Sequence, residues 1–306
     1  MDPKPHKTYE AQIELLIERG LVITDPGEAL KILHRIGYYT LSGYLYPFRL
    51  FGSTGTRLDD FQPGIELADV ELLWDFDNQL RAATFAALQQ IETFVRSVLA
   101  YELGKVDPLI HQRPDLLRVD NENKYQEWVK KLSDRLADSR DDALTHHRQL
   151  RAGVTPIWVV TDALDWGGLS HLFAFSPHEV RKSVAEQFDL SAAQMKSWLR
   201  ALNHVRNICA HHARFFNRAY INIGMRPKTG RGEAFEEIRG RRDTTFAMLM
   251  MIQYLGSSTR GFATSELPTL LASFPTGTGM TLEAMGAPAN WADLLDRVSE
   301  SDNGDR

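Results

Sequence analysis

The segment from Glu66 to Leu103 is the longest periodic stretch of the chain, and it predicts a single long helix. Its apolar side chains recur at intervals of three and four residues, which aligns them along one side of a helix with 3.6 residues per turn. These side chains are Leu73, Phe76, Leu80, Ala83, Ala87, Ile91, Phe94, Val98 and Tyr101. Other helices must cover an apolar stripe of this length, so the segment predicts the central helix of a bundle.

The rest of the chain also favours helices, because no segment alternates apolar and polar residues over a useful strand length. Ser53 to Pro63 is expected to be a loop, a helix is expected to start at Pro156, and Gly167-Gly168 is expected to break it. The sequence therefore predicts an all-α fold. Its three expected parts are a helical and aromatic segment over 1–62, a helical bundle over 63–256, and an extension with an acidic tail over 257–306.

An aromatic segment from Tyr38 to Phe51 follows the first two expected helices. Its rings can form a stacking surface for nucleic-acid bases. They can equally form a small core that seats the N-terminal helices on the bundle. We favour the small core, because few cations lie between the rings.

A dense polar stretch runs from Asn203 to Asn217, late in a helix that Ser191 is expected to cap. Positions four apart lie about 40° from each other around a helix, so Asn203, Asn207 and His211 form one polar row. The opposite face carries Leu199, Leu202, Val205 and Cys209, which suit a core. Arg206 lies about 140° from His211. The two can meet if the arginine side chain curls round, if the helix distorts or ends near His211, or in a second copy of the chain.

These residue types suit the cleavage of a phosphodiester by its own 2'-hydroxyl. Histidine takes and gives protons near neutral pH, and arginine matches phosphate oxygens with a permanent charge. Asn207 can orient His211 or hold a phosphate oxygen. A base removes the hydroxyl proton, an acid protonates the leaving 5'-oxygen, and a cation stabilises the charge on phosphorus. None of these steps requires a metal or a cofactor, and we expect neither.

Three alternatives use the same stretch. A metal site can be drawn from His204, Cys209, His211 and His212, but their spacing fits no zinc pattern. Cys209 can be a nucleophile, although it falls on the expected core face. In the third alternative the protein is an RNA-binding module without catalysis, and the motif only binds phosphate.

The order Arg206, Asn207 and then His211 resembles the Arg-x-x-x-x-His signature of the HEPN superfamily. Further runs resemble the Abi-like proteins (AbiD and AbiF type) of bacterial abortive infection. These runs are KPHKTYEAQIELL (4–16), RIGYYTLSGYLYPFR (35–49), DFDNQLR (75–81), IETFVR (91–96), PIW (156–158) and WLRALNHVRNICAHH (198–212). The resemblance implies a HEPN-type bundle and an anti-phage endoribonuclease toxin with Arg206, Asn207 and His211 as catalytic residues.

The resemblance also implies partners and products. Cleavage would leave a cyclic phosphate and a 5'-hydroxyl, and a small structured RNA would hold the protein inactive. It further implies a homodimer in which both copies of Arg206 and His211 meet. The chemistry agrees, because one histidine cannot easily act as base and acid on opposite sides of one phosphate.

Supporting residues are expected around this centre. Asn203 and His212 lie in the motif stretch, and Glu92 and Arg96 are four apart on the long helix. The Glu92–Arg96 pair is either an exposed ion pair or a brace for the catalytic side chains. A basic, glycine-containing segment follows the motif, and it is either a flexible loop that guides RNA or a solvated surface. Its cations are Arg226, Lys228, Arg231, Arg239, Arg241 and Arg242.

Composition sets outer limits on partners and location. The net charge of −5 means that any nucleic-acid contact must come from a local basic patch. The single Cys fits a reducing compartment, and the N-terminus MDPKPHK lacks the apolar core of a signal peptide. No apolar run approaches the 18 residues of a membrane span. We therefore expect a cytoplasmic protein with no membrane partner.

Overall fold

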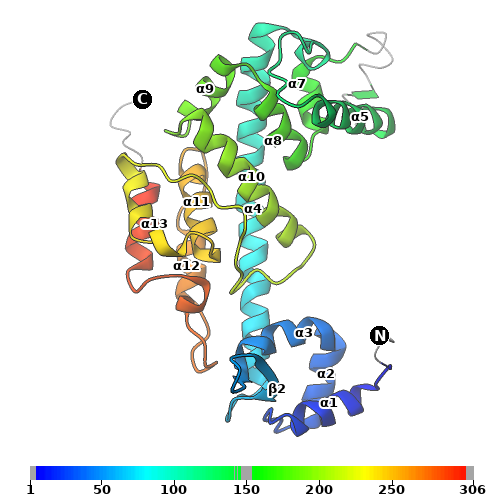
Figure 1. Ribbon diagram of the computed structural model, residues 1–306, viewed down its shortest axis with the longest axis vertical. Coiled ribbons are helices and arrows are strands. Elements are labelled where there is room, and N and C mark those ends of the chain that lie inside the picture. The colour runs from blue at the N-terminus through cyan, green and yellow to red at the C-terminus, as the bar shows by residue number, and fades with distance from the viewer. Residues whose placement is uncertain (1–4, 141, 143, 146–153, 301–306) are drawn as a thin grey trace.

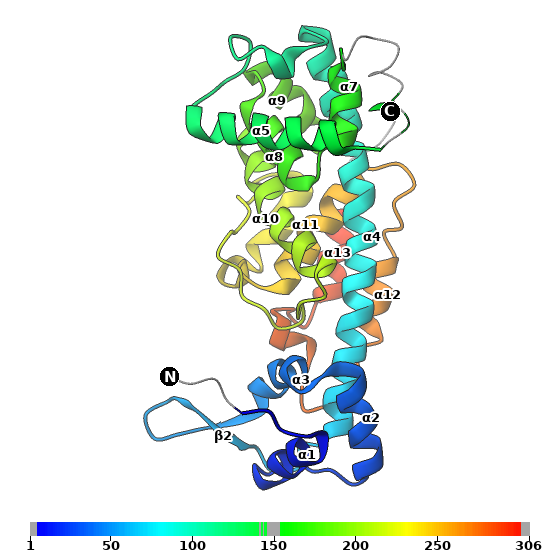
Figure 2. The same cartoon turned by 90° about the vertical axis from the view of Figure 1, so that its right-hand side faces the viewer.

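The computed structural model describes residues 5–140, 142, 144, 145 and 154–300. Its central element is α4 (Leu67–Val106), an unbroken helix of 40 residues that contacts α3, α7, α8, α9, α10, α11 and α12. At 1.5 Å per residue, α4 is about 60 Å long. It runs the height of the molecule, with the N-terminal helices at one end and α5 and α7–α9 at the other (Figures 1 and 2). The predicted central helix is confirmed, and so is the all-α fold.

The N-terminal part forms a small unit on one end of α4. It contains α1 (Tyr9–Glu18), α2 (Pro26–Ile36) and α3 (Tyr38–Leu45). Asp25 caps α2 by accepting hydrogen bonds from the N–H groups of Gly27 and Glu28 at 2.8 and 3.2 Å. Of the aromatic segment, Tyr44 and Phe48 are buried, whereas Tyr39, Tyr46 and Phe51 are exposed. The expected small core therefore accounts for only part of this segment.

A short antiparallel hairpin corrects the expectation of a loop over Ser53 to Pro63. It pairs β1 (Arg49–Phe51) with β2 (Arg57–Phe61). The Arg57 guanidinium donates to the carbonyls of Pro47 and Arg49 at 2.7 and 2.6 Å. β2 has three exposed residues in its middle, so the sequence lacks the apolar alternation that normally marks a strand. Side-chain hydrogen bonds to the backbone stabilise the hairpin instead.

The far end of the molecule holds α5 (Glu122–Asp138), α7 (Ile157–Val160), α8 (Trp166–Phe175) and α9 (His178–Glu186). The helix at Pro156 lasts only one turn, and Gly167-Gly168 begins α8 instead of breaking a helix. Asp165 explains this, because its carboxylate accepts the Gly168 N–H at 2.7 Å as the N-cap. The buried Trp166 indole then donates to the Leu199 carbonyl at 2.7 Å and joins α8 to α10.

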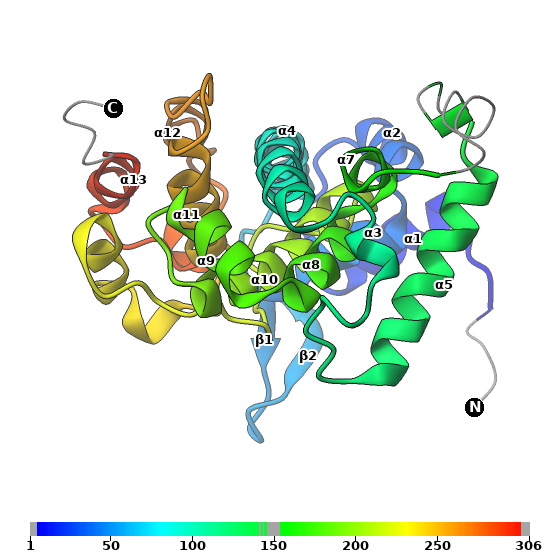
Figure 3. The same cartoon turned by 90° about the horizontal axis from the view of Figure 1, so that it is seen from above.

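The motif helix α10 (Ala192–Ala210) lies against α4, α8 and α9. Ser191 and Gln194 form a capping box at its start, so the predicted cap is confirmed. After it come α11 (Thr245–Ser257), α12 (Glu266–Ala272) and α13 (Trp291–Ser299). Viewed down α4, α12 and α13 lie on one side and α5 on the other (Figure 3).

The C-terminal part is packed into the core. α13 contacts α11 and buries Leu294, Leu295 and Val298 completely. Residues 301–306, where the acidic tail was expected to end, lie outside the described residues. In the described part of the chain, every helix is too short or too polar to cross a membrane.

Candidate active site

The end of α10 sets the position of the two histidines of the motif. α10 ends at Ala210, and His211 is its C-terminal cap with φ −98° and ψ 14°. The His211 N–H donates to the Asn207 carbonyl at 3.0 Å, whereas His212 has a φ of 55°. A positive φ is uncommon outside glycine and turns the chain out of the helix. His211 and His212 therefore stand at a corner of the chain, with both side chains exposed.

The two faces of α10 differ in burial as the sequence predicted. The core face is buried and the polar row is half-buried, with exposure increasing toward His211. Cys209 belongs to the core face, and burial raises the pKa of its thiol to about 12. The thiol is therefore protonated at neutral pH and is a poor nucleophile. This disfavours the alternative in which Cys209 carries the chemistry.

Arg206 is the half-buried cation of this helix end. Its guanidinium lies over the Phe85 ring, with 5.5 Å from Cζ to the ring centroid. Among the described residues it has neither a hydrogen-bond acceptor nor an ion-pair partner, and its buried Nε is unpartnered. A guanidinium has five N–H donors, and a buried donor without a partner is costly. Arg206 is thus poised to donate to a bound anion.

Glu92 and Arg96 approach this centre from α4. Arg96 donates to Glu92 at 2.7 Å and to the Leu164 carbonyl at 2.9 Å. Glu92 is only 9% exposed, so the pair is not the exposed surface pair that one of our two interpretations expected. Desolvation raises the pKa of Glu92, while the charges of Arg96 and Arg206 oppose that shift. The pair therefore ties α4 to the turn before α8 and lies within the electrostatic reach of Arg206.

A basic recess opens beside Asn203, and it was not among the sites expected from the sequence. It has a volume of about 450 Å³ between α5 and α8. Its charged and polar lining residues are Lys124, Glu127, Lys131, Arg135, Asp165, His171 and Asn203. Arg135 forms an ion pair with Asp165. Lys124 and Lys131 have no ion pair within the described part of the chain, and burial together with these two lysines lowers the pKa of His171. The seven- and four-residue spacing of the three cations along α5 would have revealed this basic stripe.

Asp77 anchors the chain that follows the histidine corner. Its buried carboxylate accepts hydrogen bonds from the Tyr44 hydroxyl and the Arg81 guanidinium, both at 2.5 Å. It also accepts the backbone N–H groups of Phe215 and Phe216 at 3.0 and 2.6 Å. One carboxylate therefore joins α3, α4 and the segment after His212. The only sign of this role in the sequence is a charged i,i+4 pair inside the apolar helix, and the expected site did not include it.

The predicted RNA-binding cations follow as a folded segment, which corrects the expectation of a flexible loop. Two 3-10 turns, Gly230–Glu236 and Arg239–Arg241, shape it. Arg226 pairs with Glu236, Arg239 with the same carboxylate at 3.4 Å, and Arg241 with Glu283 at 3.3 Å.

Two further arginines of this segment have buried atoms. The side chain of Arg231 is 5% exposed and donates to the Tyr254 carbonyl at 3.1 Å, while the Nε of Arg242 is buried. Lys228 is exposed and has no ion pair among the described residues. Arg231 is occupied inside the fold, and Arg226, Arg239 and Arg241 are paired, so we leave these four out of the proposed RNA surface.

The possible metal ligands do not converge. Among the residues that the structure describes, no group of three or more His, Cys, Asp or Glu side chains could hold a metal ion. This includes the set His204, Cys209, His211 and His212. His204 instead stacks edge-on against Tyr220, with 6.0 Å between ring centroids.

Comparison with known proteins gives one match. The family model of the Abi-like proteins matches residues 31–217, from α2 to the turn after His212. The matched region includes α4, the whole of α10, Asp77 and the Glu92–Arg96 pair. No curated protein and no solved structure gives a significant match.

Proposed function

The chain belongs to the Abi-like protein family, and we propose that it is a metal-independent endoribonuclease that acts as an anti-phage toxin. Family membership suggests a role in abortive infection and is compatible with a nuclease. The ribonuclease chemistry is our inference from the end of α10. The observation that carries it is the Arg206 guanidinium, half-buried without an acceptor among the described residues, on the same helix end as the exposed His211.

The proposed reaction needs one base, one acid and one cation. The base takes the proton of a ribose 2'-hydroxyl, and O2' attacks the adjacent phosphorus. The P–O5' bond breaks as the cyclic phosphate forms, and the acid gives its proton to O5'. His211 supplies the proton transfers, because imidazole exchanges protons near neutral pH. Arg206 donates to the non-bridging oxygens, where negative charge grows in the transition state.

We further propose that the working site is shared between two copies of the chain. In-line cleavage separates base and acid across the phosphorus, and each copy offers one His211. A two-fold dimer that faces the ends of both α10 helices would place one histidine on each side. Within each half, Asn207 would orient His211 or hold a phosphate oxygen, and Asn203 and His212 would line the approach.

The basic recess beside Asn203 gives the RNA backbone a route to this centre. Lys124 and Lys131 have no internal partners among the described residues, and phosphate contacts dominate affinity for nucleic acids. A small structured RNA that restrains the protein would use the same contacts. The recess also favours the second candidate, an RNA-binding module without catalysis, because phosphate binding needs no acid or base.

The test is cleavage of mixed cellular RNA by purified protein in excess EDTA. We expect the parent protein to produce 2',3'-cyclic phosphate ends, and Arg206→Ala and His211→Ala proteins to produce none. Arg200→Ala and His204→Ala are matched controls, since both residues are exposed on α10 and neither is assigned to the site. Absence of cleavage by the parent protein, together with weaker RNA binding by the Arg206→Ala and His211→Ala proteins, would favour the binding module.

A further inference from the structure

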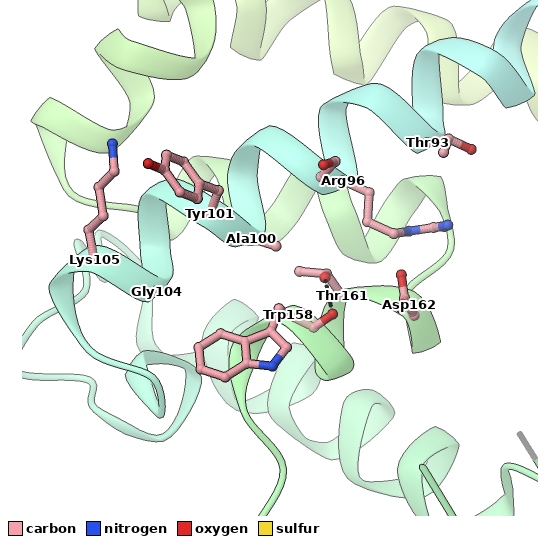
Figure 4. Close-up of a pocket in the computed structure, with 10 residues that line it drawn as sticks. Thr93, Arg96, Ala100, Tyr101, Gly104, Lys105, Trp158, Thr161 and Asp162 are labelled. Atoms are coloured by element: carbon pink, nitrogen blue, oxygen red, sulfur yellow. Dashed lines mark hydrogen bonds between the residues drawn. The ribbon is translucent and has the colours of Figure 1, made fainter. Parts of the chain in front are cut away.

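A second hollow lies between α4 and α7 (Figure 4). Its volume is about 620 Å³, within the range of about 300–1,000 Å³ that is usual for ligand sites. Arg96, Ser97, Tyr101, Lys105, Trp158 and Asp162 are among the residues that line it. We call this hollow the α4–α7 groove. Trp158 belongs to the PIW run, to which the proposed reaction assigns no role.

Two aromatic side chains of the groove are unusually exposed. Tyr101 is 66% exposed and Trp158 is 49% exposed. The indole of Trp158 lies against Gly104, where an added Cβ would come within 3.4 Å of the ring, so the glycine lets the ring rest on α4. Within the described part of the chain the Trp158 indole N–H donates no hydrogen bond, whereas the buried Trp166 and Trp198 indoles do. The exposed ring and its N–H are available to a ligand.

Polar groups of both kinds surround these rings. Lys105 Nζ lies 4.3 Å from the Tyr101 ring centroid and pairs with Glu102 at 2.8 Å. Arg96 uses one terminal nitrogen for Glu92 and for the Leu164 carbonyl, and its other terminal nitrogen has no protein partner among the described residues. Ser97 and Asp162 are exposed beside them. Aromatic faces with flanking cations and small polar groups match a nucleotide better than an aliphatic peptide side chain.

The groove is connected to the candidate active site through α4. Arg96 lines the groove and holds Glu92, which interacts electrostatically with Arg206. From Thr93 to Lys105 the groove follows twelve positions of α4 (105 − 93), which correspond to about 18 Å. A single strand of RNA bound at Arg206 could therefore continue into the groove.

We propose that the α4–α7 groove binds the bases of single-stranded RNA next to the scissile phosphate, by stacking on Trp158 and Tyr101. The proposal rests on the proposed function in that the ligand is RNA. Stacking accepts every base, because each base has an aromatic face, so the groove would prefer unpaired RNA without reading a sequence. It would position the strand, while the end of α10 would cleave it.

The test measures RNA binding by His211→Ala protein, so that cleavage does not interfere. Fluorescence anisotropy with a labelled ten-nucleotide RNA would compare Trp158→Ala and Tyr101→Ala, each in the His211→Ala background. Leu72→Ala is the matched control, because Leu72 is an apolar residue of α4 with the same 49% exposure as Trp158 and lies outside the groove. We expect Kd to rise by about five-fold to about a hundred-fold for the groove variants and to stay constant for the control.

A second ligand and a second variant keep the test independent of folding. An abasic RNA of the same length should bind parent and groove variants alike, because it has nothing to stack. Ser97→Glu changes an exposed helix position on the groove and should weaken the binding of both ligands by charge repulsion. Groove variants that bind the base-carrying RNA as tightly as the Leu72→Ala control would overturn the proposal. The proposal would also be overturned if a groove substitution changed the oligomeric state, measured by light scattering, and left RNA binding unchanged.

The two proposals fail in different ways. If parent protein cleaves RNA and the groove variants bind RNA normally, the ribonuclease stands and the groove does not. If parent protein never cleaves RNA but His211→Ala protein binds it in a Trp158-dependent way, the groove stands and the ribonuclease does not. An absence of RNA binding by His211→Ala protein would also overturn the groove.

Discussion

Two arginine-bearing regions follow each other along the chain and use their charges in different ways. At the end of α10, Arg206 lies over a phenylalanine ring and has no acceptor among the described residues. In the segment from Arg226 to Arg242, Arg226, Arg231, Arg239 and Arg241 each contact a carboxylate. Arg206 in the first region is therefore unpaired among the described residues, whereas four of the six cations of the second region are paired. Density of charge in a sequence does not indicate which charges remain free for a ligand.

The largest effect expected from this comparison concerns Arg206. Arg206→Ala should lower the rate of RNA cleavage by about a hundred- to a thousand-fold, because it removes the donor to the transition-state charge. Its unfolding free energy should change little, since Arg206 donates no hydrogen bond to the described residues and the variant loses only the contact with the Phe85 ring. Single-turnover cleavage and urea denaturation would measure the two quantities. If Arg206→Ala protein were stable and cleaved RNA at the parent's rate, Arg206 would be no more available to RNA than the paired arginines of the second region.

Arg231 should behave in the opposite way. Its buried guanidinium donates to the Tyr254 carbonyl and Ser258 hydroxyl at 3.1 and 2.7 Å and lies over the Tyr254 ring. Arg231→Ala should lower the unfolding free energy by about 3 kcal/mol, because buried acceptors lose their donor. Cleavage per folded molecule should stay at the parent's level. If the denaturation curve of Arg231→Ala protein coincided with that of the parent, the hydrogen bonds of Arg231 would not stabilise the fold, and Arg231 would be as available to a ligand as Arg206.

Two histidines extend the comparison to pH. His111 is buried, and desolvation lowers its pKa to about 4, whereas His211 is exposed at the corner after α10. In the unfolded chain His111 takes up a proton below about pH 6.5, whereas in the folded protein it does so only near its lowered pKa of about 4. Stability should therefore fall as the pH drops from about 6.5 to about 4, by at most about 1.4 kcal/mol per pH unit.

His111→Phe isolates this contribution, because it removes the titrating group and keeps an aromatic ring. The variant should lose less stability than the parent over that pH window in urea denaturation at several pH values. Parallel curves for the parent and His111→Phe would show that His111 does not titrate differently in the two states.

The smallest expected effect distinguishes free lysines from paired surface arginines. Lys131→Ala should weaken RNA binding a few-fold and reduce the salt dependence of binding by about one phosphate contact. Arg239→Ala should leave both unchanged, although Arg239 is more exposed than most cations, because it already pairs with Glu236 at 3.4 Å. Salt titrations of RNA affinity would measure both variants. If RNA affinity depended equally on salt in Lys131→Ala and Arg239→Ala proteins, the ion pair of Arg239 would not determine which cations contact RNA.

Local periodicity predicted the helices but not the contacts between them. The apolar stripe predicted α4 within a few residues, and Ser191 correctly marked the start of α10. The hairpin at Arg57 was missed, because backbone hydrogen bonds from an arginine side chain stabilise it rather than apolar alternation. The glycine pair after Asp165 was misread, because the N-cap outweighs the low helix propensity of glycine.

In the candidate site, too, residue spacing predicted which residues share a helix face but not which residues contact each other. The polar and apolar faces of α10 follow from residue spacing, so the burial of Cys209 and the exposure of His211 were predictable. Three of the four hydrogen bonds of Asp77 come from residues 33 to 139 positions away, and no local pattern reveals them. The burial of Arg231 likewise depends on elements distant in sequence, since its guanidinium donates to the carbonyls of Val298 and Phe188. Spacing identifies which residues share a face, whereas only the fold decides which of them are free.

The most direct test of the central claim places one deoxynucleotide at a mapped cleavage position. After the parent protein's cleavage site in an RNA oligonucleotide is located, the same oligonucleotide is made with a 2'-deoxyribose on the 5' side of the scissile phosphate. Attack by the 2'-hydroxyl predicts that parent protein, in EDTA, cleaves the all-ribose strand at this position and leaves the substituted strand intact there. Cleavage of both strands at equal rates, or cleavage of the all-ribose strand by His211→Ala protein at the parent's rate, would contradict the account.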